Sequence, residues 1–203
     1  MSLEAISVTP KTDKQPTRLL VALHGWGANA QDLASLASYF ELNDYQMVFP
    51  NAPFPHYQVP GGRAWYALEQ EGYPGLPDSR QILTDWLLSL EATTQIPRSR
   101  TVLAGFSQGG AMALDVGLQL PVAQVCSLSG YLHFSPQRRE NPPSVLLIHG
   151  RQDAVVPLSL AQQAQQNLEA VGVSTDYREF EMGHEISPEA LEAFQAFLAQ
   201  PLI

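Results

Sequence analysis

Hydrophobic positions alternate between two periods along this chain. Short, nearly continuous apolar runs predict buried strands, which we place at residues 19–23, 46–49, 101–106, 124–129, 145–149 and 175–180. Between these runs, apolar residues recur every three or four positions, as at Leu33, Leu36, Ala37 and Phe40, and again at Ile82, Leu83, Trp86, Leu87 and Leu90. Strands that alternate with helices predict an α/β fold with a mostly parallel central sheet and helices on both faces.

Three later helices have boundaries that can be predicted from single residues. The helix after residue 106 is expected to end at Pro121, because proline cannot continue a helix. A helix from about Leu158 should stop at Gly172, a residue type that favours helix ends. The last helix should begin with Ser187 as N-cap and Pro188 at its first position.

One segment, from Pro50 to Asp78, follows neither period. It is rich in proline, glycine and aromatic residues. Long irregular loops in compact domains are uncommon and often functional. We therefore expect residues 1–203 to form a single domain in which this excursion supplies a wall of the substrate site.

Composition and charge argue against two classes of binding partner, nucleic acid and anionic membranes. The formal net charge of -9 would repel nucleic acid and anionic lipid, and Arg138-Arg139 is the one local basic pair. Residues 1–5 lack a basic start and an apolar core, so we expect no signal peptide, cytoplasmic residence and no stable membrane association. Cys126 lies in an apolar run and should be a buried structural thiol. No feature predicts an oligomeric state.

The pentapeptide Gly105-Phe106-Ser107-Gln108-Gly109 fits the pattern G-x-S-x-G. It lies between a predicted strand and a stretch of small residues that can begin a helix. In this context the pattern is typical of a nucleophile elbow, where a sharp turn forces the serine into a strained backbone conformation. The neighbours must lack side chains that would collide with strand or helix, and glycine meets that need. Ser107 is therefore the candidate nucleophile.

A serine hydroxyl is a weak nucleophile at neutral pH, so Ser107 needs a base and a group that orients the base. In the strand-to-helix arrangement the chain order is serine, then aspartate or glutamate, then histidine. His184 follows the last predicted strand, at the sheet edge where catalytic groups of such folds collect. His149 ends its own strand, which favours a packing role, and His133 is a third possibility. We predict His184 as the base.

Asp153 is the predicted orienting acid, because it lies just past the strand that precedes His184. Taken alone it would more safely be interpreted as a turn residue or a helix-initiating acid. The segment 155–157 follows it, and should start the next helix and exclude water. Asp115 falls within a predicted helix and Asp176 within a predicted strand, so neither fits the required position.

Acyl transfer also places negative charge on the former carbonyl oxygen, which needs two hydrogen-bond donors. The backbone N–H of Gln108, directly after the nucleophile, is the first predicted donor. The second is the Trp26 N–H, because Gly25 and Gly27 let the main chain of that loop approach closely. No Cys-x-x-Cys, His-Glu-x-x-His or acidic ligand cluster occurs in the sequence, so no metal is expected.

Together these stretches resemble the phospholipase/carboxylesterase family of α/β hydrolases, which includes bacterial carboxylesterases and acyl-protein thioesterases. The matching residues run through nearly the whole chain in the family's order, at 23–27, 50–53, 64–66, 105–111, 149–150, 153, 156–157 and 183–184. The resemblance implies an α/β-hydrolase fold without a large cap domain and a triad of Ser107, Asp153 and His184. It also implies cleavage of carboxylic ester or thioester bonds in a small-molecule substrate, without a cofactor.

Four residues are candidate substrate contacts: Trp26, Trp65, Tyr66 and Val156. Trp26 stands where many members of the family carry leucine, so its indole could fill part of an acyl pocket. The aromatic residues would suit an apolar acyl group. Packing of the loop onto the sheet would explain them equally well.

The sequence therefore predicts a serine carboxylesterase that works through an acyl-enzyme. A serine peptidase or amidase on the same fold is an alternative, which the small size and the lack of an added domain disfavour. A non-catalytic ligand-binding protein that has kept the hydrolase fold is another. Such a protein would have no need for all three triad side chains.

Overall fold

The structure is a computed structural model that describes residues 3–10, 12 and 15–202. Its strands are β1 (Ala5–Val8), β2 (Arg18–Leu23), β3 (Tyr45–Pro50), β4 (Phe54–Pro55), β5 (Arg63–Ala64), β6 (Thr101–Phe106), β7 (Gln124–Leu128), β8 (Ser144–Gly150) and β9 (Thr175–Phe180). Its α-helices are α1 (Ala30–Ala34), α2 (Leu76–Thr94), α3 (Gln108–Gly117), α4 (Leu158–Ala170) and α5 (Pro188–Leu198). Two 3₁₀ helices, η1 (Ser35–Tyr39) and η2 (Arg98–Arg100), complete the elements.

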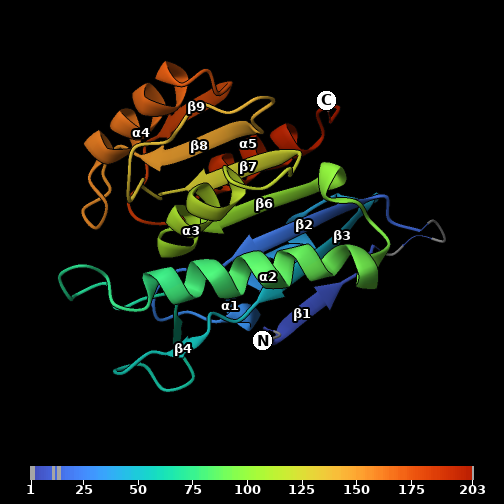
Figure 1. Ribbon diagram of the computed structural model, residues 1–203, viewed down its shortest axis with the longest axis horizontal. Helices are drawn as coiled ribbons and strands as arrows, with labels where there is room; N and C mark the ends of the chain where they lie inside the picture. The colour runs from blue at the N-terminus through green and yellow to red at the C-terminus, as the bar shows by residue number, and fades with distance from the viewer. Residues whose placement is uncertain (1–2, 11, 13–14, 203) are drawn as a thin grey trace.

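A seven-stranded sheet with the order β1-β3-β2-β6-β7-β8-β9 forms the centre of the molecule (Figure 1). Every neighbouring pair is parallel except β1 with β3. Parallel strands end at one edge of a sheet, so the loops after β2, β6, β8 and β9 meet there. The predicted α/β fold with a mostly parallel sheet is confirmed.

Each face of the sheet has its own hydrophobic core. Along β2, Leu19, Val21 and Leu23 face a core that also contains side chains of α2, α3 and α4. The alternate residues Leu20 and Ala22 face the opposite core, to which α1 and α5 contribute. Because successive side chains of a strand point to opposite faces, a strand that is buried on both faces contributes side chains to both cores. Figure 1 shows α2 and α3 in front of the sheet, on the first of these faces.

The structure departs from the predicted elements near the N-terminus. β1 was not predicted, because it is four residues long, lies at the sheet edge and is only half-buried. The stripe predicted as one helix, residues 33–40, is divided between α1 and η1. The hydroxyl of Ser35 donates to the Asp32 carbonyl, and that of Ser38 to the Ser35 carbonyl. Such side-chain bonds compete with the regular α-helical pattern.

The later helix boundaries test three single-residue predictions. Ser187 is the N-cap of α5, as predicted, and its side chain accepts a hydrogen bond from the Ala190 N–H. Gly172 follows α4 with a φ of 87°, the left-handed conformation that favours glycine. The predicted end of α3 at Pro121 is wrong, since the helix ends at Gly117. A Cβ there would meet Val125 of β7 at 2.5 Å, so the helix end lies directly on that strand.

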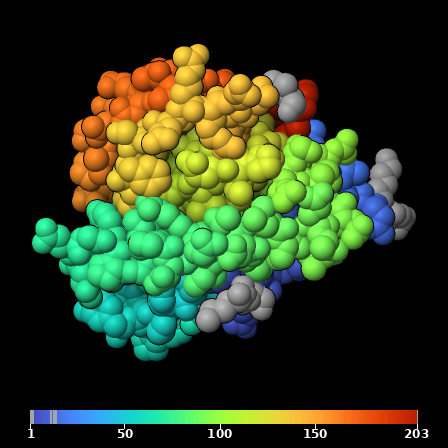
Figure 2. All heavy atoms as spheres, viewed as in Figure 1, coloured from blue at the N-terminus to red at the C-terminus, as the bar shows by residue number. Residues whose placement is uncertain are grey.

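The predicted excursion, Pro50 to Asp78, is shorter at both ends and covers residues 51–75, since Pro50 is the last residue of β3. α2 begins at Leu76, so the last residues of the predicted range are helical. Within the segment, β4 and β5 form a short antiparallel hairpin in which Phe54 pairs with Ala64. The Arg63 side chain donates to the Ala52 carbonyl and ties the hairpin to its own start. Figure 2 shows this segment, in cyan and turquoise, on the surface beside α2.

Two glycines let α3 start directly on the sheet. A Cβ at Gly105 would overlap the carbonyl oxygen of Gly109. A Cβ at Gly109 would overlap the carbonyl oxygens of Leu23 and His24, at the end of β2. Both neighbours are backbone atoms, which cannot move aside as a flexible side chain can. At the turn after β6, backbone therefore packs directly on backbone, with no side chain between.

We predict that Gly105→Ala lowers the free energy of unfolding by about 3 kcal/mol, because the added methyl group has no space. The matched control is Gly172→Ala, where nothing lies within 4 Å of an added Cβ but φ is positive. Backbone strain alone should cost that variant about 1 kcal/mol. Urea denaturation measures both, and equal losses in the two variants would contradict the steric account.

Candidate active site

Ser107 lies at the turn between β6 and α3. Its φ of 55° and ψ of -119° are unusual for a residue other than glycine, as expected of an elbow. The Ser107 N–H donates to the Leu128 carbonyl over 2.8 Å, which fixes the turn against the end of β7. The residue is 9% exposed. The hydroxyl is thus held on a rigid turn at the carboxyl edge of the sheet.

The structure brings Ser107, His184 and Asp153 into one hydrogen-bonded chain. His184 Nε2 lies 2.9 Å from the Ser107 hydroxyl oxygen, and His184 Nδ1 lies 2.7 Å from Asp153 Oδ2. When Nδ1–H donates to the carboxylate, Nε2 is free to accept the hydroxyl proton. The three residues follow β6, β8 and β9, whose parallel course ends at the same edge. This arrangement can activate a serine as a nucleophile.

Asp153 is oriented by backbone donors as well as by His184. Its Oδ1 accepts hydrogen bonds from the N–H groups of Val155 and Val156, over 2.9 and 2.8 Å. Burial opposes ionisation and is the largest single influence on this carboxyl, but the hydrogen bonds from His184, Val156 and Val155 together outweigh it. The pKa of Asp153 therefore lies below its ordinary value. The carboxylate stays charged where it faces the imidazole.

The two other histidines considered as bases make other hydrogen bonds, and His149 Nε2 also lies 3.5 Å from Asp153 Oδ2. His149 is buried, and its Nε2–H donates to the Val156 carbonyl over 2.8 Å. It thereby holds the loop that carries Asp153, which fits the packing role expected for it. His133 lies 2.6 Å from Asp115 and 2.8 Å from the Tyr66 hydroxyl, on the α3 side of the site. Neither ring hydrogen-bonds to the Ser107 hydroxyl.

The two predicted oxyanion donors belong to two segments that meet at Ser107, the first turn of α3 and the loop after β2. The Gln108 N–H is the first of α3 and has no acceptor within the helix. The Trp26 N–H donates to none of the residues that the structure describes. A Cβ at Gly25 would lie 3.4 Å from the Ser107 Cβ, so the loop after β2 rests against the elbow. Both N–H groups therefore remain available beside the hydroxyl.

A buried polar network, which the sequence did not reveal, ties the 64–66 segment to the elbow. The Gln108 side chain accepts from the Trp65 N–H and donates to the Tyr66 carbonyl, each over 2.9 Å. The Trp65 indole donates to the His24 carbonyl over 3.0 Å. The Ala52 N–H donates to His24 Nε2, and burial lowers the pKa of that imidazole. In the sequence, the amide side chain of Gln108 could have indicated this network, because it directly follows Ser107.

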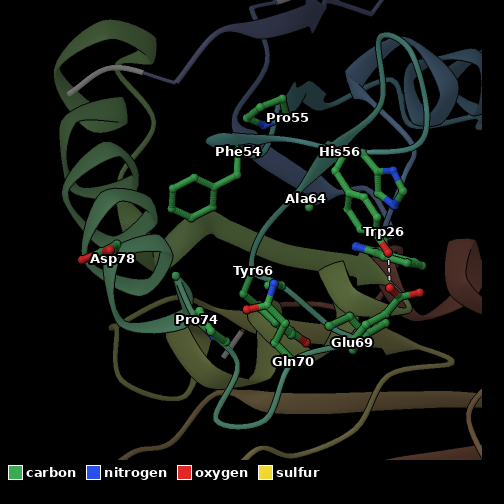
Figure 3. Close-up of a pocket in the computed structure, with 14 residues that line it drawn as sticks. Trp26, Phe54, Pro55, His56, Ala64, Tyr66, Glu69, Gln70, Pro74 and Asp78 are labelled. Atoms are coloured by element: carbon green, nitrogen blue, oxygen red, sulfur yellow. Dashed lines mark hydrogen bonds between the residues drawn. The ribbon is translucent and has the colours of Figure 1, made fainter.

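The predicted substrate contacts fall into two groups. Trp26 and Tyr66 line a cavity of about 500 Å³ that lies under the β4-β5 hairpin (Figure 3). Trp65 is fully buried and belongs to the core, and Val156 is buried with its N–H on Asp153, so neither lines this cavity. Of the two roles considered for the loop aromatic residues, packing is therefore the one that fits Trp65. Ser107 is not among the residues that line the cavity.

The hydroxyl of Tyr66 is fixed from behind by a second network. It lies 2.6 Å from the Tyr131 hydroxyl and 2.8 Å from His133 Nε2. His133 in turn contacts Asp115, which also accepts two hydrogen bonds from Arg80. Burial raises the pKa of Tyr131 to about 12, so this phenol is neutral at physiological pH. The cavity wall at Tyr66 is thus rigid.

Two classes of feature are missing from the part of the chain that the structure describes. No group of three or more His, Cys, Asp or Glu side chains within it could hold a metal ion. No helix within the same residues is long and apolar enough to cross a membrane.

Comparison with known proteins gives consistent matches over nearly the whole chain. A model of the phospholipase/carboxylesterase family matches residues 4–202. Acyl-protein thioesterase 1 of Saccharomyces cerevisiae is 30% identical over 217 residues, which cover 93% of this chain and 95% of that protein. Esterase YpfH of Escherichia coli strain K12 is 26% identical over 200 residues, covering 91% and 83%. The crystal structure of esterase PE8 superposes with a TM-score of 0.89 at 30% identity, over 98% of both chains.

The lowered pKa of Asp153 predicts a pH-dependent contribution to stability. A carboxylate whose folded pKa is below its unfolded value, here 3.8, stabilises the native state above that value. The contribution is lost as the pH falls through the folded pKa. Urea denaturation should therefore show a stability difference between wild type and Asp153→Asn that shrinks below about pH 4. A difference that is unchanged or larger at the acid end would contradict this prediction.

Proposed function

The chain belongs to the phospholipase/carboxylesterase family and is a hydrolase of ester or thioester bonds, and we propose that it works through an acyl-enzyme formed on Ser107. The single observation that carries the proposal is the chain of two hydrogen bonds from Ser107 through His184 to Asp153. Support also comes from the strained φ at Ser107, which is typical of a nucleophile elbow.

In the first half of the reaction, the Ser107 hydroxyl attacks the carbonyl carbon while His184 Nε2 takes its proton. The tetrahedral intermediate collapses when the imidazolium gives that proton to the leaving alcohol or thiol. In the second half, His184 takes a proton from water, which attacks the carbonyl carbon of the acyl-enzyme. The imidazolium then returns the proton to the Ser107 oxygen as the bond to the acyl group breaks and the acid is released. Asp153 remains ionised throughout and stabilises the imidazolium, in keeping with its lowered pKa.

We propose the N–H groups of Trp26 and Gln108 as the donors for the oxyanion. The argument is that neither group donates to an acceptor among the residues that the structure describes, while the backbone around them is closely packed. Donors that are already aligned need no reorganisation when charge develops on the carbonyl oxygen. Each such donor typically contributes about 10²- to 10³-fold to the rate.

We propose that the substrate is a small-molecule ester or thioester. The relatives from yeast and Escherichia coli are named a thioesterase and an esterase, which fits either leaving group. Two sequence-based expectations remain proposals of the same kind: a single domain over residues 1–203 and residence in the cytoplasm. The first is supported by the one sheet that both hydrophobic cores share.

We predict stoichiometric labelling of the wild-type protein by a fluorophosphonate and no labelling of Ser107→Ala. The same substitution should lower kcat/KM for a short p-nitrophenyl ester by about 10⁴-fold or more, because the nucleophile is lost. The control is Ser135→Ala, which removes an exposed hydroxyl and should leave both readouts unchanged. A Ser107→Ala protein that still labels, or a folded wild type inert toward probe and ester alike, would refute the proposal.

A further inference from the structure

The imidazole of His24 lies directly after β2, and both of its nitrogens have partners. Nε2 lies 3.0 Å from the backbone nitrogen of Ala52, whose N–H can only donate, so Nε2 is the acceptor and carries no hydrogen. The ring hydrogen of the neutral imidazole is then on Nδ1, which donates to the Gly25 carbonyl over 2.7 Å. His24 is 1% exposed, and burial lowers its pKa, which keeps the ring neutral.

The Gly25 carbonyl belongs to the same peptide group as the Trp26 N–H. Since this group is planar and trans, its C=O and N–H point in opposite directions and turn together. The hydrogen bond from His24 to the carbonyl therefore also fixes the direction of the Trp26 N–H. If the group turned over, the carbonyl oxygen would take the place of the N–H and present a partial negative charge to the proposed oxyanion.

Gly25 makes this peptide group easy to turn. The group rotates through the dihedral angles on either side of it, ψ of Gly25 and φ of Trp26, and glycine restricts its own angles least of all residues. A larger residue would not fit, because a Cβ at this position would lie 3.3 Å from the Phe106 ring. The close approach of the loop to the elbow thus requires a residue that leaves the peptide group free, and another contact must hold it.

The other hydrogen bonds of this loop hold the peptide group less firmly. The Gly27 N–H donates to the Arg63 carbonyl over 2.9 Å, but it belongs to the next peptide group. The Ala28 N–H donates to the Gly25 carbonyl over 3.3 Å, which is longer than an ordinary hydrogen bond. The bond from His24, at 2.7 Å, is the shorter of the two that this carbonyl accepts. It also polarises the peptide group, which strengthens the N–H as a donor.

The ring of His24 is itself held in place. The Ala52 N–H fixes Nε2, and the ring lies 5.8 Å from that of Trp65 at an angle of 34°. The Trp65 indole donates to the backbone carbonyl of His24 over 3.0 Å. The imidazole is therefore supported by the segment after β3 and by the 64–66 segment. The buried network described above thus reaches the loop that carries Trp26.

We propose that His24 is a positioning residue, whose Nδ1–H locks the peptide group between Gly25 and Trp26 so that its N–H serves the oxyanion. The inference rests on the proposed function, because it explains how one of the proposed donors is held. His24 acts only through the Trp26 N–H. Because the oxyanion exists only in the transition states and tetrahedral intermediates, loss of the lock lowers kcat and kcat/KM alike.

Two substitutions divide the ring into its two hydrogen-bonding halves. His24→Asn places an amide N–H near the position of Nδ1, but has no acceptor near that of Nε2. His24→Gln places an acceptor near the position of Nε2 for the Ala52 N–H, but has no donor to the Gly25 carbonyl. Each variant therefore loses one buried hydrogen bond, and only the second loses the lock.

With a short p-nitrophenyl ester, His24→Gln should lower kcat and kcat/KM by about 10- to 100-fold, because a misdirected oxyanion donor costs at most about 10²- to 10³-fold. His24→Asn should retain most of the wild-type kcat. A trifluoromethyl ketone, which adds to the serine as a tetrahedral oxyanion, should bind His24→Gln more weakly by about the same factor. The corresponding secondary alcohol forms no adduct and should bind both variants as it binds the wild type.

Nuclear magnetic resonance reports on the lock without turnover. The chain has three tryptophans, so ¹⁵N-tryptophan labelling gives few signals. The Trp26 amide signal should move downfield when the ketone binds to wild type, and should move less in His24→Gln. The Trp65 amide, which donates to Gln108, should be unchanged and shows that the site is still folded. In ¹⁵N-histidine-labelled wild type, which needs no variant, His24 should carry its hydrogen on Nδ1.

Three results would overturn the proposal: a His24 ring in wild type that is charged or carries its hydrogen on Nε2, an unchanged kcat in His24→Gln, or equal losses of kcat in the two variants. A wild type that forms no adduct with a fluorophosphonate would instead refute the acyl-enzyme function. If the adduct forms, any of the three results refutes the positioning role alone.

Discussion

The site depends on backbone segments that touch where no side chain intervenes. Gly109, in the first turn of α3, rests on the carbonyl oxygens of Leu23 and His24, so the helix starts directly on the end of β2. Gly25 rests against Ser107 from the other side. These contacts bring the turn after β6 and the loop after β2 to one point. A side chain at Gly109 would push α3, and with it Ser107, away from the end of β2 and the loop that carries Trp26.

Buried hydrogen bonds hold the remainder of the site around that contact. The Gln108 side chain joins the elbow to the 64–66 segment, and the Trp65 indole joins the same segment to the His24 carbonyl. On the opposite side, His149 holds the Val156 carbonyl while the Val156 N–H orients Asp153. Such networks rigidify a site when every member has a partner. Rigid donors and acceptors are what electrostatic stabilisation of a transition state requires.

The sequence predicted the parallel strands and the residues that follow them, because strands buried on both faces are continuous apolar runs. Ser107, Asp153 and His184 could be found in this way, since each lies just past such a run. Contacts between irregular segments could not be predicted in the same way. The position of Trp65 in the core and its hydrogen bond to the His24 carbonyl both depend on how residues 51–75 fold back on the sheet. That segment has no period from which a direction could be inferred.

An acyl group attached to Ser107 during turnover is the central claim, and peptide mass spectrometry of an acid-quenched reaction tests it most directly. The enzyme would be mixed with excess of a slowly deacylated ester and quenched within the first turnovers. The account predicts a mass increase equal to the acyl group on the peptide that contains Ser107, which disappears once the substrate is exhausted. Hydrolysis with no adduct at any time in the reaction, or with an adduct on another residue, would contradict it.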